Sequence, residues 1–167
     1  SVETVDALIK VLIQDLFDTM YKAKGVGLAA TQIGVLQRAL VIDLDPTGEA
    51  RHDQEYDEQL KSWGFARPQA FINPEIIENS GSIWWEEGCL SVPGVTEKVK
   101  RSENITVKAL NAKGEEFTLS ATGLYAVAIQ HEMDHLVGKV FVEYLSKLKR
   151  DVVKRKMLKL KTTLKKY

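Results

Sequence analysis

The sequence predicts an α+β fold, in which short and mostly antiparallel strands pack around a central helix. Three observations support this class: helical periodicity before residue 25, several strand-like segments between residues 38 and 121, and a second helical segment near residue 130. Strands and helices come in blocks here, whereas a doubly wound sheet would alternate them regularly. With 167 residues, of which 44% are hydrophobic, the chain fits one compact domain.

The first expected element is an amphipathic N-terminal helix over residues 4–24, ended by Gly25. Its apolar stripe repeats at helical spacing: Val5, Leu8, Leu12, Leu16 and Met20, widened by Ile9, Ile13, Phe17 and Tyr21. Residues 25–35, GVGLAATQIGV, have neither helical nor strand periodicity and predict a loop. The apolar run in residues 38–45 predicts a buried strand.

The middle of the chain alternates between polar and strand-like segments. Residues 46–68 are polar and charged, so we expect a long surface loop or insertion there. Residues 69–77 and 81–94 predict strand segments broken by turns. Residues 104–121 alternate on both sides of Asn-Ala-Lys-Gly, which is typical of a hairpin.

Two further helices are expected in the last third. One covers residues 124–137 and is ended by Gly138. The other is the lysine-rich C-terminal tail, whose apolar residues recur at helical spacing: Leu145, Leu148, Val152, Leu160 and Leu164, with Val153 and Met157 beside them.

Composition limits the class of protein. No run approaches the roughly 18 apolar residues of a membrane span, and the start of the chain does not resemble a secretory signal, so we expect a cytoplasmic protein. The single cysteine, Cys89, excludes an internal disulfide and suits a reducing compartment. The net charge is zero, but residues 147–167 hold ten basic side chains against Asp151, so a cationic tail balances an acidic body.

The segment QHEMDH at residues 130–135 is a candidate metal motif. Positions four apart share one face of a helix, so His131 and His135 can bind one ion, each at about 2.0–2.1 Å. Glu132 lies beside them and can reach a water at that ion without being a ligand. The pattern indicates metal-assisted hydrolysis. A surface helix that holds two histidines by chance is the alternative, and the apolar residues around them disfavour it.

A catalytic site of this type generally needs a third protein ligand. In the extended protease motif that ligand follows six residues after the second histidine, where this chain has Phe141, and no carboxylate follows Asp151 in the tail. We therefore look upstream, where Cys89 offers a thiolate suited to a borderline or soft ion. The alternative for a lone cysteine is a small buried hydrophobic residue.

The stretch GVGLAA at residues 25–30 matches a dinucleotide-binding fingerprint by letter only. That fingerprint needs a strand before it and a helix after it, and here a helix comes before. We expect instead a loop with close backbone approach, or one that clears space for a substrate chain. In the second case Gln32 could offer its amide to a developing oxyanion.

Residues 25–32 (GVGLAATQ), 87–91 (EGCLS) and 130–136 (QHEMDHL) together closely resemble the three motifs of peptide deformylases of the bacterial type with a cysteine metal ligand. The basic tail is similar to that of Gram-negative members. The resemblance implies one deformylase domain over residues 1–167, with residues 146–167 as a basic C-terminal helix. It also implies a hydrolase that removes the N-formyl group from the formylmethionine of nascent polypeptides and releases formate.

The resemblance further implies the roles of the motif residues. Cys89, His131 and His135 would hold the metal, which makes the central helix the metal-binding one. A metal-bound water would attack the formyl carbon, with Glu132 as general base and then general acid. The ion expected in cells is Fe²⁺, while Zn²⁺, Ni²⁺ or Co²⁺ can occupy such a site in the isolated protein.

By the same resemblance, the Gln32 amide and the Leu90 backbone N–H would stabilise the oxyanion. The peptide would lie as an added strand, hydrogen-bonded to the backbone at Val26 and Gly88. The implied substrate-binding residues are Val26, Gly27, Gly88, Leu124, Val127 and Ala128, of which the last three would surround the methionine side chain with His131. Leu124 and Val127 are equally well explained as ordinary core residues.

The chain departs from the family pattern in three places. It begins almost at the first helix, whereas members usually carry about twenty residues before it. The segment 46–69 is longer than usual, and Trp85 stands where a smaller residue is common. Trp85 either borders the substrate cleft and narrows its entrance or belongs to a core cluster with Trp84.

The basic tail predicts a partner. Lysine and arginine neutralise phosphates without reading bases, so we expect docking on RNA, and the resemblance favours the ribosome. The alternative is a solvated helix packed by its leucines. We expect a monomer that binds neither DNA nor membrane. The rival functions are a small zincin-like endopeptidase and a non-catalytic metal-binding protein that docks on RNA.

Overall fold

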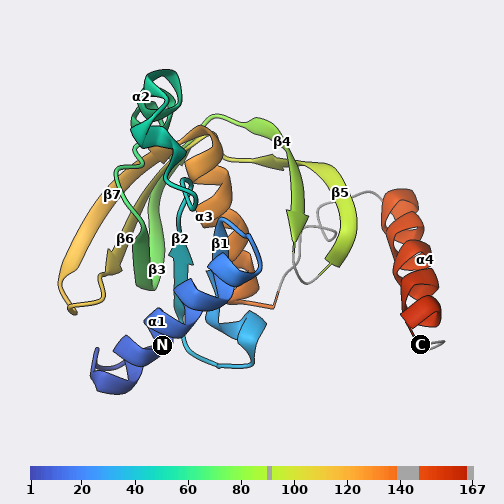
Figure 1. Ribbon diagram of the computed structural model, residues 1–167, viewed down its shortest axis with the longest axis horizontal. Coiled ribbons are helices and arrows are strands. Elements are labelled where there is room, and N and C mark those ends of the chain that lie inside the picture. The colour runs from blue at the N-terminus through green and yellow to red at the C-terminus, as the bar shows by residue number, and fades with distance from the viewer. Residues whose placement is uncertain (90–91, 139–146, 165–167) are drawn as a thin grey trace.

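The computed structural model describes residues 1–89, 92–138 and 147–164, and it confirms the α+β class (Figure 1). Its elements in chain order are α1 (Ala7–Lys22), β1 (Gly27–Ala29), the 3-10 helix η1 (Ala30–Ile33), β2 (Ala39–Ile42), the 3-10 helix η2 (Glu49–Arg51), α2 (Gln54–Ser62), β3 (Gln69–Ser80), β4 (Ile83–Cys89), β5 (Val92–Arg101), β6 (Asn104–Leu110), β7 (Glu116–Thr122), α3 (Gly123–His135) and α4 (Lys147–Leu164).

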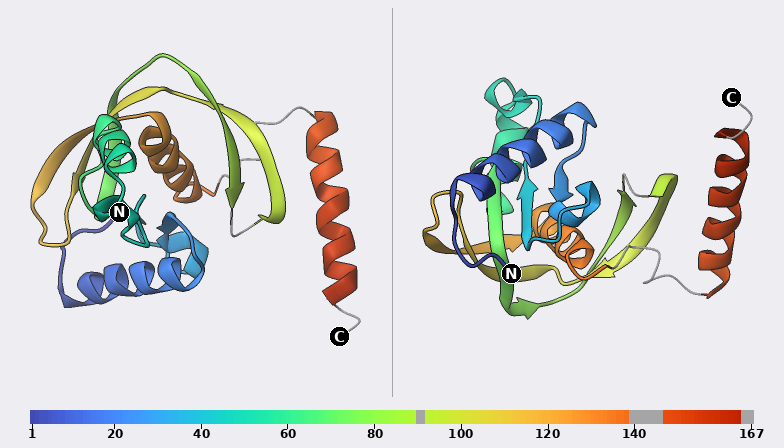
Figure 2. Two further views of the ribbon diagram at one scale, coloured as in Figure 1. Left: turned by 45° about the horizontal axis from the view of Figure 1, so that its top comes forward. Right: turned by 90° about the horizontal axis from the view of Figure 1, so that it is seen from below.

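The strands form two antiparallel sheets. One has five strands in the order β1-β2-β3-β6-β7, and the other is the hairpin of β4 and β5. The hairpin predicted over residues 104–121 is confirmed as β6 and β7. The strand predicted within 81–94 is also present, but its partner β5 runs on to Arg101. In Figures 1 and 2, α3 lies inside the curve formed by the two sheets.

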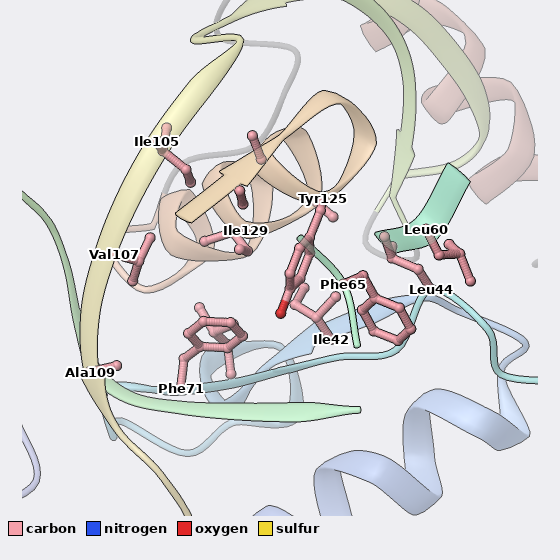
Figure 3. Packing of buried hydrophobic residues seen from close by; sticks show 14 of the residues in the cluster. Ile42, Leu44, Leu60, Phe65, Phe71, Ile105, Val107, Ala109, Tyr125 and Ile129 are labelled. Atoms are coloured by element: carbon pink, nitrogen blue, oxygen red, sulfur yellow. The ribbon is translucent and has the colours of Figure 1, made fainter. Parts of the chain in front are cut away.

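The sheet is covered on both faces. Every residue of β2 is buried, because Leu40 and Ile42 belong to the core on the α3 side while Ala39 and Val41 belong to the core on the α1 side. This two-sided burial explains why the predicted strand is a continuous apolar run. Figure 3 shows the α3 side, where Phe71 and Tyr125 are among the largest side chains.

Helix α1 begins where Asp6 accepts a hydrogen bond from the Ile9 N–H at 3.0 Å. Its buried face consists of Ile9, Leu12, Ile13, Leu16 and Met20. The predicted stripe was wrong about Leu8, which is 78% exposed. The predicted apolar face was wider than the face of α1 that is buried in the structure.

Two segments predicted as loops contain regular structure. Residues 25–35 hold β1 and η1, which are too short to show periodicity. Residues 46–68 hold α2, which begins at Asp53, the acceptor of the Tyr56 N–H at 3.1 Å. Two side chains fix this otherwise polar helix to the body: Leu60 is buried, and the Tyr56 hydroxyl donates to the Leu44 carbonyl at 2.6 Å.

Helix α4 lies beside β5 (Figure 2). Val153 is its buried residue among those described, and Lys149 approaches Glu97 of β5 at 3.5 Å. The predicted apolar stripe does not match the buried face, because Leu148 is 72% exposed. Within the described ranges, no helix is both long and apolar enough to cross a membrane.

Gly64, which follows α2, offers a test of how closely this part of the chain packs against β7. Gly64 has φ +90°, and a Cβ there would overlap the backbone oxygen of Ser120, whereas Gly34 has φ +80° and open space around it. We expect Gly34→Ala to lower the free energy of unfolding by about 1–2 kcal/mol from backbone strain alone. Gly64→Ala should lose about 1–3 kcal/mol more through overpacking. Denaturant unfolding measures the free energy of unfolding of both variants. Equal losses of stability would contradict the close approach of Gly64 to Ser120 of β7.

Candidate metal centre

Helix α3 brings the two motif histidines together. His131 and His135 are both buried, their rings meet edge to face, and their Nε2 atoms lie 3.1 Å apart. Two nitrogens bound at 2.0–2.1 Å to a tetrahedral ion are separated by about 3.3 Å. Ligand atoms of His131, Glu132 and His135 all lie within 4.8 Å of one another. This donor set fits one metal ion.

The tautomer of His131 also suits a ligand. Its Nδ1 lies 2.6 Å from Glu87 Oε1 on β4, and a carboxylate in that position accepts the ring proton. Nδ1–H then donates to Glu87 and leaves the lone pair on Nε2, on the side of His135. Metal-binding histidines are commonly held by a carboxylate in this way.

Glu87 belongs to a buried network of charges. Arg101 donates to both of its oxygens, from Nε at 2.8 Å and from Nη2 at 2.9 Å, and Arg101 Nη1 donates to Asp134 on α3. Burial raises the pKa of Glu87, but the hydrogen bonds and charges of Arg101 and His131 outweigh it and hold the pKa below its ordinary value. Burial likewise lowers the pKa of Arg101, and its two carboxylate partners raise it above the ordinary range. Glu87 and Arg101 are therefore both ionised at neutral pH.

The Glu132 side chain is buried and lies close against strand β1. It is 7% exposed, and a Cβ on Gly27 of β1 would lie 2.9 Å from both its Cγ and its Oε1. Gly27 therefore permits the close approach of strand and carboxylate. Gly27 therefore does not belong to a dinucleotide-binding fingerprint, because the short 3-10 helix η1 and not a long helix follows β1.

Two side chains of η1 make hydrogen bonds near the centre. The Gln32 side-chain oxygen accepts the Ala29 N–H at 2.9 Å, which fixes the orientation of the amide group. The Thr31 hydroxyl donates to the His135 carbonyl at 2.8 Å. The loop and the ligand helix are thus joined at the end of α3.

A cavity of about 580 Å³ opens beside His131 and Glu132. Its lining includes all of the residues for which substrate contact was predicted: Val26, Gly27, Gly88, Leu124, Val127 and Ala128, together with Gln32. Trp85 also lines it, whereas Trp84 is 64% exposed. Trp85 therefore shares no core cluster with Trp84 and borders the cavity instead.

Cys89 is the last residue of β4, two positions after Glu87, so its backbone lies at the end of the strand that reaches His131. Its role as the third ligand stays a prediction. Leu90 and Phe141 lie outside the described residues.

The sequence motifs did not reveal the network of Glu87, Arg101 and Asp134. Glu87 and Asp134 stand inside the recognised motifs, yet Arg101 is 14 and 33 residues away from them. Part of this network could have been expected, because Glu87 follows apolar strand residues and a buried carboxylate needs a partner.

The sequence as a whole resembles known proteins. A model of the polypeptide deformylase family matches residues 1–151. Peptide deformylase of Neisseria meningitidis serogroup C is 49% identical over 158 residues, which make up 95% of this chain and 84% of that protein. Peptide deformylase 1 of Shewanella oneidensis is 49% identical over 154 residues, or 92% of this chain and 82% of that protein.

Solved structures share the fold. A peptide deformylase from Legionella pneumophila has a TM-score of 0.84 at 43% identity, covering 99% of this chain and 88% of its own. Peptide deformylase from Ehrlichia chaffeensis in complex with actinonin has a TM-score of 0.83 at 39% identity, covering 95% and 87%. The likeness therefore extends over sequence and architecture together.

The Glu87–His131 hydrogen bond predicts a loss of metal affinity on mutation. Glu87→Gln can no longer hold the His131 tautomer as a charged acceptor, and we expect divalent metal to bind about 10–100-fold more weakly. Titration with Zn²⁺ against a chelating indicator measures this. Glu86→Gln is the matched control, because Glu86 is exposed and accepts a bond from Thr96. Unchanged affinity in Glu87→Gln would show that this hydrogen bond does not prepare the site.

Proposed function

Because the chain belongs to the polypeptide deformylase family, and is a hydrolase that removes the formyl group from nascent peptides, we propose that the cavity beside His131 receives the formylated end of the substrate. The observation that carries this proposal is the meeting of buried His131, Glu132 and His135 with an apolar cavity wall. The family is metal-dependent, and these residues could hold the ion.

The proposed ligands are Cys89, His131 and His135. A divalent ion bound there would supply Lewis acidity, which polarises a carbonyl group and acidifies water. Two observations support the histidines: the 3.1 Å separation of their Nε2 atoms and the Nδ1–H of His131 held by Glu87. We propose Fe²⁺ as the ion in cells, with Zn²⁺, Ni²⁺ or Co²⁺ able to replace it in isolated protein.

Glu132 is the proposed proton carrier. It takes a proton from the attacking water and delivers it to the leaving amine, and its place between the two ligand histidines supports this role. Gln32 and the backbone N–H of Leu90 are the proposed donors to the oxyanion. For Gln32 the support is its place in the cavity lining beside Glu132, with its amide group oriented by the Ala29 N–H.

The substrate backbone is proposed to extend along β1 as an added strand, near Gly88 of β4. Val26, just before β1, and Gly27, its first residue, are the proposed partners on this side. The Asp43 N–H donates to the Val26 carbonyl at 2.9 Å, so this carbonyl points towards β2. Alternation then directs the polar backbone groups of Gly27 to the open edge.

We also propose that α4 docks on the RNA of the ribosome, where nascent chains emerge, and that the protein works as a monomer in the cytoplasm. The support for docking is the cationic surface of α4, on which Lys154, Arg155 and Lys156 are all exposed while Val153 holds the helix to the body.

The catalytic proposal is tested by formate release. We expect Glu132→Ala to lower the rate of formate release from a formyl-Met-Ala-Ser peptide by about 10²–10⁴-fold, because proton transfer is lost. An enzyme-coupled formate assay measures the rate, and metal content is determined for both proteins. Full activity in the variant at equal metal content would refute the role of Glu132. Absence of formate with the metal-loaded wild type would refute the site.

The docking proposal is tested by charge removal. Exchanging Lys154, Arg155 and Lys156 for glutamine should weaken ribosome co-sedimentation at low salt without changing formate release from a short peptide. A triple variant of Lys10, Lys22 and Lys113, which are exposed elsewhere, is the matched control. Equal sedimentation of both variants and wild type would show that α4 does not carry the interaction.

A further inference from the structure

The segment between β2 and β3, residues 43–68, reaches the wall of the cavity. It contains α2, whose C-cap residue is Trp63. The Trp63 ring meets the Trp85 ring edge to face, with centroids 6.3 Å apart and an interplanar angle of 89°. Trp85 belongs to β4 and lines the cavity. A surface segment distant from the histidines thus touches a side chain of the cavity lining.

Trp63 is held firmly in this position. Its backbone N–H donates to the carbonyls at the end of α2, and its own carbonyl accepts the Thr122 N–H at 3.1 Å. Its indole packs against Gly123, where any Cβ would overlap the ring. Phe65 adds a second anchor by meeting Tyr125 of α3 edge to face at 5.4 Å. The segment is therefore joined to the first turn of α3.

That first turn also belongs to the cavity. Leu124 and Val127 line it together with Trp85, so Trp63 contacts the helix on one side and the facing indole on the other. The Trp85 indole, held edge to face against Trp63, cannot move away from Trp63 to enlarge the space between β4 and α3 without breaking this ring contact.

We propose that Trp85, positioned by Trp63, determines the size of the first substrate side chain that the cavity accepts. The proposal rests on the proposed function, since it needs the formylated residue to enter this cavity. Trp85 is the specificity-determining residue, and Trp63 is a positioning residue that acts through it. The segment 43–68 thereby contributes to substrate choice although it lies outside the metal-binding motifs.

The test compares two substrates in a double-mutant cycle. The measured quantity is the ratio of kcat/KM for formyl-Phe-Ala-Ser to kcat/KM for formyl-Met-Ala-Ser. We expect Trp85→Ile to raise this ratio by about 10-fold, because the cavity gains room for the larger ring. Trp63→Leu should raise it by a smaller factor, and it should have no further effect once Trp85 is isoleucine.

Two controls sharpen the result. Trp84→Ile changes the exposed neighbour, which does not line the cavity, and should leave the ratio unchanged. Peptides that differ only in the second residue should keep their wild-type ratio in every variant. If Trp63→Leu does not fold, as judged by circular dichroism, Trp63→Phe takes its place in the cycle.

Three outcomes would overturn the proposal: an unchanged ratio in Trp85→Ile, a change confined to the second residue, or equal effects of the Trp63 exchange in both backgrounds. Each of these leaves formate release from formyl-Met-Ala-Ser intact. Failure of the proposed function would instead appear as no formate from the metal-loaded wild type, so the two failures are distinguishable.

Discussion

The buried carboxylate of Glu87 is the interaction on which the rest of the site depends. The β4–β5 hairpin forms no strand pair with the five-stranded sheet among the described residues, so something other than a backbone ladder must fix its distance from α3. Glu87 bonds His131 while Arg101 bonds Glu87 and Asp134, which ties the hairpin to α3 at two points. Removing one partner from a buried ion pair such as Glu87–Arg101 typically costs about 3–5 kcal/mol. The same contacts therefore fix the cavity wall and the histidine tautomer.

The buried partners of Glu87 fix both its charge and the position of the proton on His131. The carboxylate stays ionised because Arg101 compensates its desolvation, and an ionised acceptor holds the imidazole proton on Nδ1. The charge of Arg101 is in turn kept by two carboxylates. On the other side of α3, the Thr31 hydroxyl and the contact of Gly27 with Glu132 bring β1 and η1 against the same helix. The centre is held from both sides by hydrogen bonds, from Glu87 on one side and from Thr31 on the other, and the apolar core of the sheet keeps those sides in place.

Much of the fold and site could be predicted because the relevant patterns are local. The helix period places His131 beside His135, and the period of two places β6 opposite β7, so neither needs information from elsewhere in the chain. The cavity residues followed from the resemblance and lie on the elements that carry the motifs. Arg101 could not be predicted, since its partners are distant in sequence. Helix α2 was missed because within the helix few side chains, chiefly Tyr56 and Leu60, contact the body and give no clear apolar period. Leu8 and Leu148 were misplaced because periodicity predicts an apolar stripe but not how much of it a neighbouring element covers.

Both histidines, Glu132 and three apolar residues of the cavity stand on a single helix, α3. A rigid helix moves as one body, so any shift that reshaped its part of the cavity would also displace the nitrogens that face each other at 3.1 Å. Over evolutionary time, α3 is therefore the least adaptable wall. Changes in what such an enzyme accepts can instead accumulate at Trp85 and on the surface segment behind it, because neither holds a proposed metal ligand nor bonds His131.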